Sequence, residues 1–156
     1  MSKNSKKRII LVIGARPNFV KVAPMVRELK KYNYKFNYTI LHTGQHYDYE
    51  MSEAIFEDLD IPEPDIYLGI GGGTHAEQTG KIMMAFEKVL IEGEYDLVVV
   101  FGDVNSTLAS TIVAKKLHIP VAHVEAGLRS FDERMPEEIN RKITDVLSNI
   151  LFSPST

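Results

Sequence analysis

The amino-acid sequence has no cysteine, and this absence excludes disulfide-stapled folds, thiolate zinc sites and cysteine nucleophiles together. A chain without cysteine fits a reducing compartment, so we expect a cytoplasmic protein. Long apolar stretches are also lacking, because the longest continuous runs, residues 9–13 and 97–101, fall far short of the ~20 residues that span a bilayer. We therefore expect neither a membrane-spanning nor a secretory segment.

An excess of positive charge is absent as well. The 156 residues include 18 lysines and arginines against 21 aspartates and glutamates, a formal net charge of −3. We therefore expect no nucleic-acid partner, and an anionic ligand must be bound by local groups. Lys3, Lys6 and Lys7 precede the first apolar run, and we interpret residues 1–7 as a solvated tail, the alternative being a basic binding arm.

What the sequence does contain is the composition of one ordinary globular domain, with 44% hydrophobic and 25% charged residues. Two apolar runs are continuous rather than alternating and end in a glycine, which is typical of strands buried on both faces of a parallel sheet. The strands predicted in this way lie at residues 8–13, 36–41, 97–101, 120–125 and from 150 onward. Helical periodicity predicts helices near residues 18–31, 48–59, 74–92, 105–117 and 136–148.

The alternation of strands and helices predicts right-handed βαβ crossovers. The expected fold class is therefore α/β: a three-layer, Rossmann-like domain with a mostly parallel sheet, formed by residues 1–156. In sheets of this kind, ligands bind in the crevice beyond the carboxyl ends of the strands. The residues that follow each predicted strand are therefore the candidates for a functional site.

The loop after the first strand contains Gly14 and Arg16. The glycine permits a close approach of the backbone to a ligand, and the guanidinium of Arg16 offers donors suited to phosphate oxygens, so a diphosphate is the expected guest. Lys21, further along the following helix, would extend this anion site. The alternative is an arginine that caps the sheet edge or pairs with an acid, with Lys21 as a solvated surface residue.

Carboxylates follow two later strands. Asp103 comes directly after a buried strand and is a candidate for proton transfer, although capping of the helix that begins near Asn105 would explain it equally well. Glu125 ends a short strand at a point where a turn residue is more usual, and His123 shares its face two positions earlier. A histidine on a strand is more often a satisfied core group than a catalyst.

Two further features have plain structural explanations. Glu137 and Glu138 stand in the first turn of a predicted helix, where acids stabilise any helix through its dipole. The glycine-rich residues 69–73 lack the Lys-Ser/Thr of a phosphate-binding P-loop. We therefore interpret them as a flexible loop, followed by a helix that Thr74 and Glu77 cap.

Five segments, taken in order, resemble the motifs of a known family. They are residues 14–24, 43–46, 102–107, 123–130 and 135–141, which read GARPNFVKVAP, TGQH, GDVNST, HVEAGLRS and MPEEINR. In these segments the chain is similar to the non-hydrolysing UDP-N-acetylglucosamine 2-epimerases. The resemblance implies the amino-terminal half of a GT-B-type architecture, in which two Rossmann-like domains face each other across a cleft. The carboxyl-terminal nucleotide-binding domain would lie outside this chain.

The resemblance also implies an isomerase that converts UDP-N-acetylglucosamine to UDP-N-acetylmannosamine. In this family UDP is eliminated as the carbon-2 proton leaves, 2-acetamidoglucal forms, and UDP re-adds after reprotonation on the opposite face. Neither a metal nor a cofactor is implied. Asp103, Glu125 and Glu137 match the catalytic carboxylates, with the base among them left open, and Arg16 and Lys21 match basic residues near the diphosphate.

Three more residues take expected roles from the resemblance. Arg141 matches an arginine that helps to position Glu137 or the ligand. Gln45 and His46 match a motif that in many bacterial members helps to bind a second, activating UDP-N-acetylglucosamine molecule. The resemblance further implies a UDP-sugar as the partner, a homodimer for the full-length enzyme, and an amino-terminal domain that is essentially inactive alone.

Alternative functions stay open at this stage. A related branch of the family epimerises UDP-2,3-diacetamido-glucuronic acid and shares similar loops. The first motif reads Gly-Ala-Arg-Pro-Asn rather than Gly-Thr-Arg-Pro-Glu, which keeps that substrate in view. A GT-B glycosyltransferase half would share the fold, and composition alone also permits a non-enzymatic, flavodoxin-like module that binds a partner or a small anion.

Overall fold

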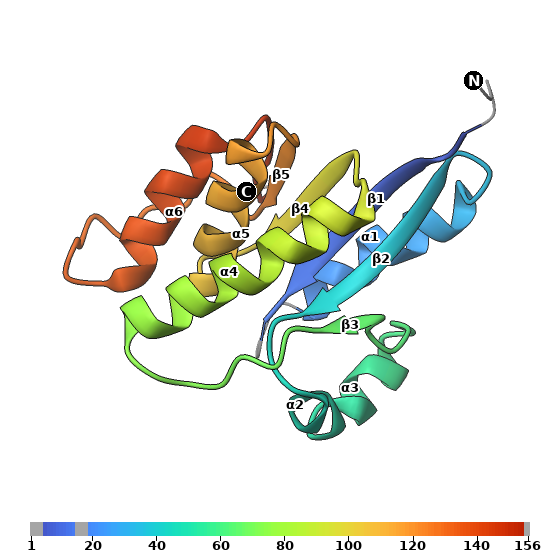
Figure 1. The fold of residues 1–156 in the computed structure, drawn as a ribbon, viewed down its shortest axis with the longest axis horizontal. Helices are drawn as coiled ribbons and strands as arrows, with labels where there is room; N and C mark the ends of the chain where they lie inside the picture. Colours follow the sequence, from blue (N-terminus) through green and yellow to red (C-terminus); the bar gives the residue numbers. More distant parts are fainter. Residues whose placement is uncertain (1–4, 15–18, 155–156) are drawn as a thin grey trace.

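The structure is a computed structural model that describes residues 5–14 and 19–154. Strands and helices alternate along almost the whole of this described chain (Figure 1). In chain order the elements are β1 (Lys7–Ile13), α1 (Phe19–Lys31), β2 (Phe36–His42), α2 (His46–Glu50), α3 (Glu53–Asp58), β3 (Ile66–Tyr67), α4 (His75–Gly93), β4 (Leu97–Phe101), α5 (Asn105–Lys116), β5 (Val121–Val124), α6 (Pro136–Leu147) and β6 (Ile150–Phe152).

The strands of the described residues form one sheet in the order β3-β2-β1-β4-β5-β6. Every neighbouring pair is parallel, and the chain order reverses its direction across the sheet between β1 and β4. This is the strand order of a Rossmann-like domain, in which the ligand crevice lies where the order reverses. The expected α/β fold with a parallel sheet is therefore confirmed.

Three details differ from the expectations. The helix predicted at residues 48–59 is wrong as one element, because Ser52 leaves the helical region with φ −115° and ψ 5° and divides it into α2 and α3. The two-residue strand β3 was not predicted, since a strand of that length leaves no periodic signal. β1 begins at Lys7, which pairs with Phe36, so the last residue of the expected tail belongs to the sheet.

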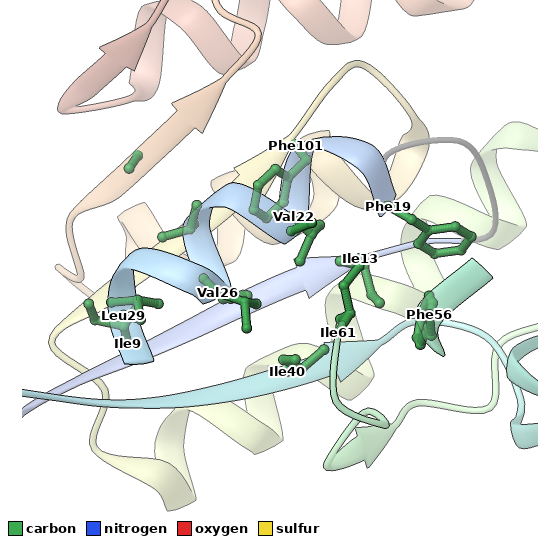
Figure 2. Close-up of a cluster of buried hydrophobic side chains, with 14 of the residues drawn as sticks. Ile9, Ile13, Phe19, Val22, Val26, Leu29, Ile40, Phe56, Ile61 and Phe101 are labelled. Atoms are coloured by element: carbon green, nitrogen blue, oxygen red, sulfur yellow. The ribbon is translucent and has the colours of Figure 1, made fainter. Parts of the chain in front are cut away.

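One hydrophobic core lies between the sheet and α1. Alternate residues of β1, Ile9, Leu11 and Ile13, face this side and pack against the apolar stripe of α1. Figure 2 shows the cluster, with Phe56 of α3 closing it next to Phe19, whose ring centroid lies 4.6 Å away in an edge-to-face arrangement. Full burial of such a side chain is worth about 1.5–3 kcal/mol, so this contact fixes the first turn of α1 at the end of the sheet.

The second core lies on the opposite face, between the sheet and helices α4 and α5. The intervening residues of β1, Ile10 and Val12, point into it and meet Phe86 of α4 and Val113 of α5. Both faces of β1 are thus buried, which explains its unbroken apolar run. α6 packs against α5 and β5 (Figure 1). No helix in the described part of the chain is long and apolar enough to cross a bilayer.

Candidate functional site

The carboxyl ends of β4 and β5 lie side by side and lead into two of the predicted acidic residues. Phe101 pairs with Val124 at the last position of the two strands, and Gly102 N–H donates to the Val124 carbonyl at 2.9 Å. Asp103 and Glu125 follow these paired residues within two positions. The sheet therefore delivers both acids to the same edge, as the sequence predicts.

Asp103 is held by an arginine from α6. Its Oδ2 accepts a hydrogen bond from Arg141 Nε at 2.9 Å and forms an ion pair with Arg141 Nη2 at 2.6 Å. The residue that caps the start of α5 is Val104, which offers no side-chain bond. The alternative that Asp103 is present as a helix cap is therefore wrong.

Arg141 also contacts Glu138 on its own helix, with Nη1 3.3 Å from Oε1. Glu138 is completely buried and accepts the backbone N–H groups of Ser130 and Phe131 at 3.0 Å and 2.8 Å. The bond from Ser130 lowers the pKa of Glu138, burial opposes it, and Phe131 and Arg141 tip the balance, so this pKa lies below its ordinary value. Glu138 therefore holds the loop before α6 in place, and this role is additional to the favourable interaction of an acid with the helix dipole.

Glu137, the third predicted carboxylate, stands in the first turn of α6 and is half-buried. Its side chain makes no ion pair or side-chain hydrogen bond with any described residue. The acids that Arg141 contacts are Asp103 and Glu138, so a role for Arg141 in positioning Glu137 has no direct contact behind it. α6 nevertheless brings Glu137 to the part of the fold where Arg141 holds Asp103.

Glu125 leaves β5 in a left-handed conformation, with φ 73°. Its N–H donates to the Phe152 carbonyl at 3.0 Å, and its carboxylate forms an ion pair with Lys21 of α1. The side chains of Lys21 and Glu125 are 37% and 21% exposed, and both line a pocket next to Ser153. Lys21 is therefore a partner of a predicted catalytic acid rather than a solvated surface residue.

Arg16 lies outside the described residues. Gly14, directly after β1, lies in close contact with the start of α5, because a Cβ atom there would stand 2.7 Å from Ser106 Oγ and 3.5 Å from Thr43 Oγ1. The loop after β1 therefore begins between the segments that follow β2 and β4.

A cleft of about 340 Å³ opens at this point of the sheet edge. Thr43 and Gly44 after β2 form one wall, and Asn105 and Ser106 of α5 form another. The glycine-rich segment contributes residues 70–72 to the lining, and a Cβ added at Gly71 or Gly72 would meet nothing within 4 Å. The helix that follows is capped as predicted, because Thr74 Oγ1 accepts the Glu77 N–H at 3.1 Å.

Gln45 and His46 are directed elsewhere. Gln45 N–H donates to Asp48 Oδ2 at 2.7 Å at the start of α2. The two ring nitrogens of His46 lie 3.0 Å from Glu50 Oε1 and 3.1 Å from Glu63 Oε1. Among the described residues, the structure thus groups His46 with acids beyond β2 and does not bring it to Asp103 or Glu125.

Some contributors to the site carry little signal in the sequence. Asn140 donates from Nδ2 to the Asp103 carbonyl at 3.0 Å and to Asn105 Oδ1 at 3.2 Å, and only its place within the segment 135–141 marks it. His42, at the end of β2, is buried and accepts the Gly44 N–H on Nδ1 at 2.9 Å. Burial lowers the pKa of His42 despite the opposing charge of Asp48.

The geometry fits proton transfer near an anionic group. Two acids at one sheet edge, Asp103 and Glu125, each contact a cation, and the half-buried Glu137 lies on the helix that supplies Arg141. Carboxylates in this setting can take up and return protons, and the cations can balance charge that develops on a departing oxyanion. The part of the chain that the structure describes contains no group of three or more His, Asp or Glu side chains arranged to hold a metal ion.

Comparison with known proteins gives a consistent result. A sequence profile described as UDP-N-acetylglucosamine 2-epimerase matches residues 27–156. A UDP-N-acetylglucosamine 2-epimerase homolog of Methanococcus maripaludis is 51% identical over 95% of this chain and 41% of its own length. The UDP-2,3-diacetamido-2,3-dideoxy-D-glucuronate 2-epimerase of Pseudomonas aeruginosa is 50% identical over 95% of this chain and 42% of its own length. The chain thus spans about two fifths of these relatives.

Solved structures agree with the sequence matches. The crystal structure of Methanocaldococcus jannaschii UDP-GlcNAc 2-epimerase in complex with UDP-GlcNAc and UDP has a TM-score of 0.88 and 51% identity, covering 95% of this chain and 40% of that one. MurG of Acinetobacter baumannii has a TM-score of 0.63 at 15% identity over 97% of this chain and 44% of its own. The likeness to MurG is one of fold alone, and it agrees with the GT-B-type half that the sequence predicts.

Proposed function

The chain belongs to the UDP-N-acetylglucosamine 2-epimerase family, and from this we propose that the protein to which it belongs inverts carbon 2 of UDP-N-acetylglucosamine. The observation that carries the proposal is the placement of Asp103 and Glu125 at the ends of two paired strands, each in contact with a cation. Proton transfer to and from carbon requires such groups at one point of a crevice. The substrate named for the M. jannaschii structure supports the choice of UDP-sugar.

In the proposed reaction, a carboxylate takes the proton from carbon 2 while the bond between carbon 1 and the UDP oxygen breaks. The products of this step are 2-acetamidoglucal and UDP. A carboxylic acid then returns a proton to carbon 2 from the opposite face, and the UDP oxygen re-forms its bond to carbon 1. We assign proton transfer to the set Asp103, Glu125 and Glu137.

The departing diphosphate needs cations. We assign this role to Lys21 together with Arg16, and a positioning role to Arg141 through its contact with Asp103. The ion pair between Lys21 and Glu125 places a cation beside a carboxylate before any ligand arrives. Gln45 and His46 remain assigned to a second, activating UDP-sugar, and the contacts of His46 with Glu50 and Glu63 are consistent with a separate site.

The decisive experiment is incubation of the full-length protein with UDP-N-acetylglucosamine in deuterated water. Epimerisation through carbon 2 predicts one deuterium at that carbon in both epimers, detected by mass spectrometry and proton NMR. Transfer of the sugar to an acceptor without label at carbon 2 would favour the glycosyltransferase alternative. A binding module would give neither product nor label.

A second candidate substrate is UDP-2,3-diacetamido-glucuronic acid. The observation in its favour is the 50% identity to the P. aeruginosa enzyme, which is nearly that of the epimerase homolog from M. maripaludis. Comparison of kcat/KM for the two UDP-sugars with the full-length protein separates the candidates. We expect the higher value for UDP-N-acetylglucosamine.

Three further statements belong to the same proposal. We expect the 156-residue chain alone to be essentially inactive, because the relatives are more than twice as long and the UDP-sugar would meet only one wall of its cleft. We also propose a homodimer for the full-length protein, which sedimentation can test, and a cytoplasmic location. A turnover of the isolated chain near that of the full-length protein would contradict the first statement.

A further inference from the structure

A string of hydrogen bonds, buried at His123 and exposed at Gly127, connects the two loops that carry Asp103 and Glu125. His123 of β5 is completely buried, and its Nε2 lies 2.7 Å from the Gly102 carbonyl, directly before Asp103. On the other side, His123 Nδ1 lies 2.7 Å from Asp145 Oδ1 of α6. These contacts agree with the expectation that His123 is a satisfied core group, and its two partners belong to different segments, the loop after β4 and helix α6.

Asp145 continues the string to the turn after Glu125. Its Oδ2 accepts the Gly127 N–H at 3.0 Å and forms an ion pair with Arg129 Nη1 at 2.6 Å. The carboxylate side chain is only 8% exposed. Burial raises the pKa of Asp145, but the bonds from Arg129, Gly127 and His123 together outweigh burial and leave this pKa below its ordinary value. Asp145 is therefore an ionised acceptor.

The partners of the ring determine which atoms carry protons. A backbone carbonyl accepts hydrogen bonds and cannot donate them, and the same holds for an ionised carboxylate. The Gly102 carbonyl faces Nε2, so Nε2 donates to it, and Nδ1 lies against the Asp145 carboxylate. His123 is thus paired with Asp145 and has no exposed surface for contact with a substrate.

The loops at the two ends of this string have backbone conformations that surrounding contacts must hold in place. Gly102 has φ 75°, Glu125 has φ 73° and Gly127 has φ 84°. For Glu125, a non-glycine residue, this left-handed conformation is unfavourable and persists only where surrounding contacts enforce it. One end of the string fixes the carbonyl before Asp103, and the other fixes the amide two residues after Glu125.

We propose that His123 and Asp145 are positioning residues, which as a buried hydrogen-bonded pair set the loop of Asp103 relative to the turn of Glu125. The description of those two acids as catalytic rests on the proposed function. We call the pair His123 and Asp145 the clamp. Its positioning role rests on the contacts alone, so the clamp and the proposed function can fail separately.

The first test is NMR of the 156-residue chain labelled with nitrogen-15 in histidine, at pH 7. We expect Nε2 of His123 to carry a proton that is protected from exchange with water, because it donates to the buried Gly102 carbonyl. A ring protonated on Nδ1 alone, or an Nε2 proton that exchanges rapidly with water, would overturn the proposal. This measurement uses the wild-type chain and therefore decides the matter even where a variant fails to fold.

The second test uses Asp145→Asn in the same chain, labelled uniformly with carbon-13 and nitrogen-15. We expect the NMR chemical shifts of the Gly102 carbonyl and of the Gly127 amide both to change, although only the Gly127 amide contacts residue 145 directly. Asp65→Asn is the matched control, because Asp65 also accepts a backbone N–H, that of Ile40 at 2.8 Å, on the β2–β3 side of the sheet. A shift confined to Gly127 would contradict the clamp.

The third test is kinetic and uses the full-length protein. Asp145→Asn is expected to lower kcat at least 10-fold with KM for the UDP-sugar changed less than threefold, because misplaced acids impair the chemical step more than binding. Asp65→Asn should change neither constant. Unchanged kcat in a folded Asp145→Asn protein would overturn the positioning role. A wild-type protein without epimerase activity would refute the proposed function and leave the NMR results standing.

Discussion

Arg141 joins two acids that come from different parts of the chain. Its guanidinium contacts Asp103 after β4 and the buried Glu138 on α6, and it is itself only 16% exposed. Burial lowers the pKa of Arg141, but the bonds to Asp103 and Glu138 outweigh this effect and raise it. An arginine in this position is part of the fold as well as of the site.

We therefore expect Arg141→Gln to destabilise the 156-residue chain by about 2 kcal/mol, the range for a lost hydrogen bond to a charged partner. Urea denaturation monitored by circular dichroism measures this loss. Arg134→Gln is the matched control, since Arg134 pairs with Asp132 at 2.9 Å on the surface with 91% of its side chain exposed. Equal effects of the two substitutions would contradict the description of Arg141.

The lowered pKa of Glu138 predicts a specific pH dependence of stability. A carboxyl group whose pKa is lower in the folded state than in the unfolded state stabilises the fold above the unfolded-state value, roughly pH 4. This contribution is lost as the pH falls through the folded-state pKa. We expect Glu138→Gln to flatten the acid limb of a plot of urea midpoint against pH. Glu87→Gln, on the exposed side of α4, should retain the wild-type slope, and an unchanged slope in Glu138→Gln would refute the assignment.

At the scale of elements, helix caps separate into two kinds. Thr74 caps α4 with a side-chain bond to the Glu77 N–H, whereas Ser52 stands at the start of α3 without such a bond. We expect Thr74→Ala to cost about 1 kcal/mol and Ser52→Ala to cost much less. Thermal unfolding of the two variants tests the difference. A larger loss for Ser52→Ala would show that the caps have been described wrongly.

The prediction of elements from sequence succeeds where a periodic signal is long. The continuous runs before Gly14 and Gly102 predict buried parallel strands, and the capping pattern at Thr74 predicts the start of α4. The break between α2 and α3 depends on the backbone angles of residues 51–52. Neither residue is a glycine or a proline, so the sequence gives no sign of the break. β3 is too short for any period.

The candidate site can be predicted from the sequence only where the position of a residue after a strand determines its place in the fold. Acids that follow parallel strands must share one sheet edge, so the sequence alone is enough to group Asp103 with Glu125. Their partners cannot be found in this way. Arg141 is 38 residues from Asp103, Asp145 is 22 residues from His123, and contacts over such separations leave no local pattern. The local sequence also does not indicate that, of the adjacent residues Glu137 and Glu138 on α6, it is Glu138 that is completely buried.

At the scale of the whole molecule, the candidate site of the described chain lies along one edge of its sheet, the wall that a second domain would face. The cleft of about 340 Å³, the pocket beside Lys21 and Glu125, and the contact between Arg141 and Asp103 are all built by segments that follow strands of one parallel sheet. The expected second domain would face this wall. The proton-transfer residues and the diphosphate would then meet between the two domains.

The most direct measurement is the rate of deuterium incorporation at carbon 2 by carboxylate variants of the full-length protein. We expect Asp103→Asn, Glu125→Gln and Glu137→Gln each to lower this rate by about 10² or more, the usual contribution of a general acid or base. Glu133→Gln, in the exposed loop before α6, should stay near the wild-type rate. Full activity in any folded variant of the three would remove that residue from the acid set, and full activity in all three would contradict the proposed site.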